Sequence, residues 1–197
     1  MPRTKEQLEK IKGKTRSNIL HSALELFSHK GFHGTSMNDI AVKAGISKGL
    51  AYNYFKSKND ILRAILDEAI LAGKEIQEKS FKSDDPYLQI KSMIEMTFKH
   101  IEEHETYWRM FASLMLQPEL TSQSAAMVDE FGTNVAEKLS KVFQNLGIKN
   151  PNTESKLFDA SLDGIILHYL YYKKQYPLAK VKKQLLKRYS KEYLDKI

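Results

Sequence analysis

The chain has 197 residues, of which 42% are hydrophobic, and it carries a formal net charge of +7. This length suffices to bury a sizeable core in one or two domains. The lack of cysteine excludes disulfides, thiolate zinc sites and cysteine nucleophiles. No apolar run reaches the length of a membrane span, and the start MPRTKEQLEK lacks the apolar region of a secretory signal, so we expect a cytoplasmic protein.

The positive charge is concentrated at the N-terminal end. Residues 1–58 contain 11 Lys and Arg against 4 Asp and Glu, whereas residues 59–197 contain 20 of each. This distribution favours a polyanionic partner, because lysines on phosphates release counterions and steer association. For residues 1–14, which we expect to form a polar N-terminal arm, a solvated tail is the alternative interpretation.

A first helix is predicted for residues 15–30, where Leu20, Ala23, Leu24 and Phe27 form one apolar stripe. The helix should end before Gly31. Its apolar face would serve as the platform for the segment that follows.

Residues 35–58 are predicted to form two short helices joined by a tight turn. One apolar face is made by Met37, Ile40, Ala41 and Ala44. Ser36 with Asp39 has the spacing of a capping box at a helix start. Gly45 suits the left-handed end of that helix, and Ser47 can cap the next one. Two helices this close in sequence must cross steeply, which is the geometry of a helix-turn-helix.

The second short helix, predicted from residue 48 to about residue 56, has an unusual surface. Ala51 and Phe55 can face inward, whereas the residues that point away from them are Lys48, Leu50, Tyr52 and Asn53, with Tyr54 at the edge. Gly49, with no side chain, would let the backbone come close to DNA. Amides and lysines can bond base edges, and aromatic and aliphatic groups can contact a thymine methyl. An ordinary small helix with half-buried tyrosines is the alternative interpretation.

These residues carry a family resemblance. GFHGTS at residues 31–36, DIA at 39–41, AGISKG at 44–49 and YNYFKSK at 52–58 together resemble the signature of the TetR family of bacterial transcriptional regulators. The resemblance covers roughly residues 15–75. Ala51 departs from the pattern, because a larger aliphatic residue is more common there, and this bears on how firmly the second helix is packed.

The resemblance implies a homodimer that reads a near-palindromic operator in double-stranded DNA and binds a small-molecule inducer through its C-terminal domain. By position, the residues that would hold phosphates are Thr35, Ser36, Ser47, Tyr54 and Lys58. Those that would face bases are Lys48, Gly49, Leu50, Tyr52 and Asn53.

The rest of the chain is predicted to be entirely helical. Ser57 with Asp60 should start a connecting helix that runs to about residue 78. We place the DNA-binding domain at residues 15–79 and a ligand-binding and dimerisation domain at residues 80–197. Asp85 followed by Pro86 predicts the next helix start. The expected helices span residues 86–105, 106–117, 120–146, 152–175 and 178–195.

Two sets of side chains in this second domain are candidates for binding. Bulky, soft residues that can line a hydrophobic inducer site are Met93, Met96, Trp108, Phe111, Met115 and Phe131, with plain core packing as the alternative. The helix at residues 157–172 is apolar nearly all round and therefore needs burial on more than one face. The predicted dimer interface consists of Leu162, Ile165, Ile166, Tyr169, Leu185 and Tyr189.

Two other functions remain open from the sequence. His100, Glu103 and His104 match the H-x-x-E-H pattern of some zinc hydrolases, but no third ligand is marked out. The charge alone also fits a nonspecific binder of nucleic acid or of a membrane surface. The preferred prediction is an all-α regulator without enzymatic activity, cofactor or metal, most simply a repressor that an inducer releases from its operator.

Overall fold

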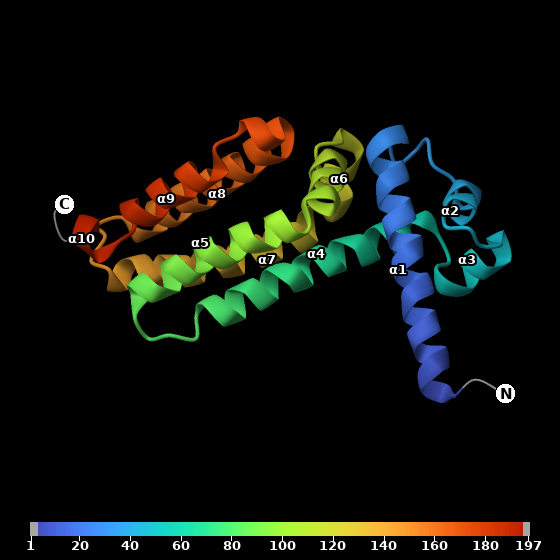
Figure 1. Cartoon of the computed structure of the whole chain (residues 1–197), viewed down its shortest axis with the longest axis horizontal. Helices are drawn as coiled ribbons and strands as arrows, with labels where there is room; N and C mark the ends of the chain where they lie inside the picture. The colour runs from blue at the N-terminus through green and yellow to red at the C-terminus, as the bar shows by residue number, and fades with distance from the viewer. Residues whose placement is uncertain (1–3, 195–197) are drawn as a thin grey trace. The chain divides into compact units, whose positions relative to one another are not determined.

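The computed structural model describes residues 4–194, with the side chains of residues 118–129 left aside. The described residues form α-helices and one short 3₁₀ helix, without a strand, as predicted. Figure 1 follows the elements in chain order: α1 Lys5–Lys30, α2 Met37–Lys43, α3 Lys48–Tyr54, α4 Lys58–Ser80, α5 Pro86–Glu103, α6 Glu105–Met115, α7 Pro118–Asn145, α8 Pro151–Tyr172, η1 Lys173–Gln175, α9 Leu178–Arg188 and α10 Lys191–Leu194.

The helices divide into two compact units. Unit 1 comprises Met1–Ala69 and Met110–Ser124, and unit 2 comprises Ile70–Arg109 and Ala125–Ile197. The division therefore falls within α4 and not at the expected boundary after residue 79. It also assigns the C-terminal part of α6 and the start of α7 to the same unit as the helix-turn-helix. Helices α4, α6 and α7 each pass from one unit into the other.

Unit 1 is built on the predicted stripe of α1. Leu20, Ala23, Leu24 and Phe27 are all buried, and Ile40 of α2 and Ile61 of α4 are fully buried with them. Asn18 of α1 donates its side-chain N–H to the carbonyl oxygen of Ala44 at 2.7 Å, which satisfies a carbonyl at the end of α2. The packing of α1 against α2 thus combines apolar burial with a specific hydrogen bond.

Helix α1 is longer than predicted, since it begins at Lys5 and so includes most of the expected arm. The physical reason is a capping box: the Thr4 hydroxyl oxygen accepts from the Gln7 N–H, and the Gln7 side chain accepts from the Thr4 N–H. The T-x-x-Q spacing of this capping box is present in the sequence, so the earlier start was predictable. Residues 1–3 of the arm lie outside the described residues.

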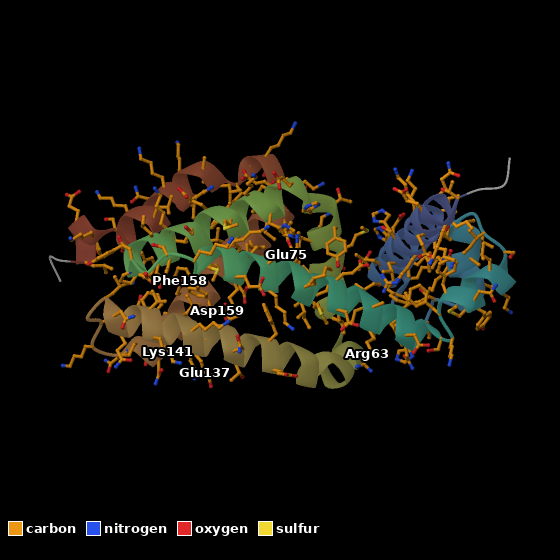
Figure 2. All side chains as sticks on the ribbon, turned by 90° about the horizontal axis from the view of Figure 1, so that it is seen from below. Arg63, Glu75, Glu137, Lys141, Phe158 and Asp159 are labelled. Carbon is orange, nitrogen blue, oxygen red and sulfur yellow. The ribbon has the colours of Figure 1, made fainter. Side chains whose placement is uncertain are left out.

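Unit 2 has a core shared by α5, α7, α8 and α9. Its buried apolar members are Ile90, Met93, Ile94, Phe98, Leu139, Val142, Phe143, Phe158, Leu162, Leu178, Leu185 and Tyr189. Figure 2 labels Phe158 on α8, which is fully buried, and Glu137 and Lys141 on α7, which are exposed. Asp85 caps α5 and Pro86 takes its first position, as predicted.

The last helices end earlier than predicted. Helix α8 stops at Tyr172, because Lys173 adopts a left-handed φ of 52° and a 3₁₀ turn follows. The final predicted helix is broken after Arg188, and α10 starts again at Lys191. Its predicted end at residue 195 lies outside the described residues. Among the helices of residues 4–194, none combines the length and apolarity that crossing a bilayer requires.

Candidate nucleic-acid interface

The turn between α2 and α3 has the predicted chemistry at each position. Ser36 caps α2, because its hydroxyl oxygen accepts from the Asp39 N–H, and the Asp39 carboxylate accepts from the Ser36 N–H at 2.8 Å. The Ser36 hydroxyl also donates to the Asp39 carboxylate, and this hydrogen bond, together with the one from the Ser36 N–H, lowers the pKa of Asp39. Gly45 has a φ of 67°, and Ser47 caps α3 by accepting from the Leu50 N–H at 3.1 Å. The steep crossing of the two helices therefore rests on local hydrogen bonds and one glycine.

Helix α3 is held by its inward face. Ala51 is completely buried and Phe55, which caps the helix end, is nearly so, with the Arg16 guanidinium 5.5 Å from the Phe55 ring centre. Although the side chain of Ala51 is small, α3 therefore packs closely against the rest of unit 1. Ala51, the departure from the family pattern, thus does not loosen the packing of α3.

The outward face of α3 carries the residues predicted to read bases. Lys48, Gly49, Leu50, Tyr52 and Asn53 are all exposed, and Tyr54 at the edge is half-buried. Leu50 and Tyr52 expose 38% and 45% of their surface. The structure thus brings together aromatic, aliphatic, amide and cationic groups on one solvent-facing surface.

Two of the five predicted phosphate contacts are occupied within the chain. Thr35 is only 2% exposed, and its hydroxyl donates to the Gly31 carbonyl oxygen at 2.9 Å. The Lys58 ammonium donates to the carbonyl oxygens of Phe32 at 2.8 Å and Thr35 at 3.1 Å, and lies 4.6 Å from the Phe32 ring centre. In this structure both side chains hold the segment 31–36 that precedes α2, called here the α1–α2 turn. Ser36 and Ser47 are exposed helix caps.

The α1–α2 turn has another partner, which the sequence did not indicate. The side chain of Gln117, just after α6, donates its Nε2–H to the Phe27 carbonyl oxygen at 2.8 Å and accepts the Phe32 N–H at its Oε1 at 3.2 Å. All of these residues belong to unit 1. Since 85 and 90 residues separate the partners, no local pattern could have predicted the contact.

The predicted inducer-binding residues are divided between the two units. Met93 lies in the core of unit 2, and Met96, Trp108 and Phe131 of the same unit are half-buried. Phe111 and Met115 are half-buried in unit 1. Phe131 lies directly on the backbone of α4, because a Cβ added at Gly73 would come within 2.6 Å of its Cζ.

The predicted dimer-interface residues mostly face the interior. Leu162, Leu185 and Tyr189 are buried core members, and Ile165 and Tyr169 pack against that core. Ile166 is half-buried. The apolar residues that α8 leaves exposed are instead Leu157, Leu167, Tyr171 and Tyr172.

The rings of His100 and His104 lie with their centres 4.6 Å apart and their planes tilted by 53°. Burial lowers the pKa of His100, and the neighbouring His104 charge lowers it further. In the part of the chain that the structure describes, no three side chains of His, Cys, Asp or Glu come together as a metal site. The pair therefore has no third ligand there, and catalytic zinc ordinarily requires one.

Comparison with known proteins points to one family. Residues 19–65 match the model of the bacterial regulatory proteins of the tetR family. The HTH-type transcriptional regulator RutR of Escherichia coli is 34% identical over 125 residues, which cover 60% of this chain and 58% of RutR. The negative transcriptional regulator IcaR of the Staphylococcus epidermidis biofilm operon is 25% identical over 130 residues, covering 65% of this chain and 69% of IcaR.

A solved structure extends the likeness to most of the chain. AibR in complex with isovaleryl coenzyme A and operator DNA matches with a TM-score of 0.67 and 17% identity, covering 87% of this chain and 96% of AibR. At 17% identity the match to AibR shows the fold alone. The match to RutR spans less than two thirds of the length of RutR. The family is one of regulators and not of enzymes. The helix-turn-helix domain of the chain therefore belongs to the tetR family of bacterial regulatory proteins, and the chain as a whole shares the fold of AibR.

Proposed function

We propose that the protein is a homodimeric repressor that binds a near-palindromic operator and is released from it by a hydrophobic small molecule. The observation that carries the proposal is the outward face of α3. Ala51 and Phe55 fix the helix from below, while Lys48, Tyr52 and Asn53 point to solvent. Side chains of these types suit the edges of bases and the phosphates of a major groove.

Charge and similarity support the same partner. The whole formal excess of +7 lies in residues 1–58, which include the helix-turn-helix. AibR is a protein of this fold that was captured on operator DNA, and IcaR is named a negative regulator. Repression follows simply from this arrangement, because a protein bound across a promoter blocks access to it.

The exposed apolar face of α8 supports self-association. Leu157, Leu167 and Tyr171 are exposed on it, and an added Cβ at Gly164 would meet nothing within 4 Å. A second copy could therefore approach the helix closely at the glycine and cover the apolar residues around it. We assign the dimer contact to this face, in place of the residues that the structure buries in the core. Two-fold symmetry then requires an operator with two related half-sites.

The inducer is assigned to unit 2, where Met96, Trp108 and Phe131 offer half-buried, adaptable apolar surface. A ligand that displaces Phe131 also acts on α4, because Phe131 rests on Gly73. The ligand lowers the affinity for DNA only to the extent that it binds the DNA-free conformation more tightly than the DNA-bound one. By linkage, DNA must weaken ligand binding by the same factor.

The test is selection of duplexes from a random library by the purified full chain. We expect an enriched near-palindrome whose half-site centres lie about 34–36 Å apart, or a multiple of that distance, bound by two chains. Light scattering on the isolated complex measures the stoichiometry, and a compound screen for release of that duplex follows. Equal affinity for selected and scrambled duplexes would show a nonspecific nucleic-acid binder and overturn the proposal.

A further inference from the structure

The α1–α2 turn is held by side chains from two distant helices. Lys58, the first residue of α4, bonds the carbonyl oxygens of Phe32 and Thr35. Gln117, which follows α6, bonds the N–H of Phe32 and the carbonyl oxygen of Phe27. The polar groups of Phe32 are thus satisfied from both sides by side chains.

The amide of Gln117 is matched to the site in a way that few side chains could reproduce. Its donor and its acceptor are used at the same time, at 2.8 Å and 3.2 Å, and both partners are backbone groups. A backbone partner cannot change its rotamer to follow a shifted amide. The two bonds therefore fix the position of the α1–α2 turn relative to the end of α6.

The rest of the α6 end is anchored in unit 1 as well. Leu114 is completely buried and Met110 nearly so. The Ser113 hydroxyl lies 3.4 Å from the Ser28 carbonyl oxygen and donates to it. Helix α6 itself begins at Glu105 in unit 2 and enters unit 1 at Met110. Gln117 consequently links the turn to a helix that originates in the other unit.

We propose that Gln117 is a positioning residue for DNA binding, which sets the α1–α2 turn and with it the start of α2 and the placement of α3. Ser36, the cap of α2, is the last residue of this turn. Helix α2 in turn packs against α3, so the position of the turn affects the position of α3. The inference rests on the proposed function. It adds a dependence of the DNA-reading surface on the position of α6.

The first experiment compares Gln117→Met with the matched surface variant Gln144→Met, because Gln144 is exposed on α7. Methionine keeps the length of the side chain and loses both hydrogen bonds. We expect operator affinity to fall about tenfold in Gln117→Met, as the loss of two ordinary hydrogen bonds allows, and faster hydrogen exchange at the Phe32 amide. Gln144→Met should leave both quantities unchanged.

The second experiment uses Gln117→Glu and varies pH. A protonated carboxyl can donate to Phe27 and accept from Phe32, as the amide does, whereas the carboxylate can only accept. The operator affinity of this variant, relative to wild type, should therefore rise as pH falls from 7 towards about 4 and the carboxyl protonates. Gln117→Met should show no such recovery, because methionine has no group that titrates.

The outcomes separate this inference from the proposed function. If wild-type protein does not prefer the selected duplex, the proposed function fails, while exchange at the Phe32 amide still tests the hold of Gln117 on the turn. If Gln117→Met binds the operator like wild type, or if Gln144→Met loses as much affinity, the positioning role is overturned. Absence of pH recovery in Gln117→Glu would also overturn it.

Discussion

The two units of the chain leave different kinds of side chain exposed. Unit 1 presents Lys48, Tyr52 and Asn53 on α3, within a segment that carries the whole formal charge excess. Unit 2 presents Leu157, Leu167 and Tyr171 on α8. Mixed polar and aromatic groups beside positive charge suit nucleic acid, whereas apolar groups around a glycine suit another protein surface. The difference assigns recognition of DNA to unit 1 and self-association to unit 2.

The largest effect on stability is expected in the core of unit 2. Phe158 is fully buried, with its ring centre 5.7 Å from that of Phe143 and 5.2 Å from that of Tyr189. Phe158→Ala should lower the free energy of unfolding by about 3–5 kcal/mol, through lost burial and the cavity left behind. Denaturant titration measures this. Lys156→Ala, two residues earlier on an exposed position, should change it by less than about 0.5 kcal/mol.

The next effect separates recognition from stability in unit 1. Lys48→Ala and Tyr52→Ala should each weaken operator binding by about 1–3 kcal/mol and leave the free energy of unfolding unchanged, because both side chains are exposed. Fluorescence anisotropy on the selected duplex measures the affinity. Lys56→Ala, also exposed but beyond α3, should weaken binding to all duplexes by a similar amount. That loss should be smaller than the loss of operator affinity in the α3 variants. Unchanged operator affinity in both α3 variants would show that this surface does not read DNA.

Lys58 can have either of two roles: it can hold the α1–α2 turn, or it can contact a DNA phosphate. Its ammonium is bonded to the Phe32 and Thr35 carbonyl oxygens, so Lys58→Met should destabilise the chain by about 1–3 kcal/mol in the absence of DNA. Thermal unfolding measures the loss, and Lys56→Met is the matched control. A variant with unchanged stability and weaker binding to every duplex would favour the phosphate contact that the family resemblance implied.

Features that depend on neighbouring residues were predictable from the sequence. The capping box of Ser36 and Asp39, the left-handed Gly45 and the cap at Ser47 were each predicted and confirmed, because a helix end is decided within a few residues. The same local reasoning could have extended α1 to Lys5, since Thr4 and Gln7 have the required spacing.

Features that depend on packing were not predictable in this way. Helix α8 is apolar nearly all round, so its composition could not tell which face meets the core, and Leu162 was assigned to the dimer contact although the structure buries it within the chain. Gln117 meets Phe27 and Phe32 across 90 and 85 residues. The position of a side chain relative to a distant backbone depends on how the helices pack. The spacing of residues along one helix does not predict that packing.

The smallest expected effect concerns two acids on α8. Burial raises the pKa of Asp159 and of Asp163, and for Asp163 the charge of Asp159 raises it further; Figure 2 labels Asp159 beside Phe158. A carboxyl with a raised pKa holds its proton more tightly in the folded chain, so its contribution to stability is lost as pH rises through that pKa. We therefore expect the charged Asp163 to oppose folding at neutral pH.

Asp163→Asn removes this charge and should raise the melting temperature at pH 7 by about 1 °C, a small gain because the side chain is partly solvated. The gain should disappear at about pH 3, where the wild-type carboxyl is protonated in both the folded and the unfolded chain. Differential scanning calorimetry at the two pH values measures the change, with Asp84→Asn in the exposed segment before α5 as the control. A lower melting temperature for Asp163→Asn at pH 7 would mean that the carboxylate has a stabilising partner, which would place a cation against this face of α8.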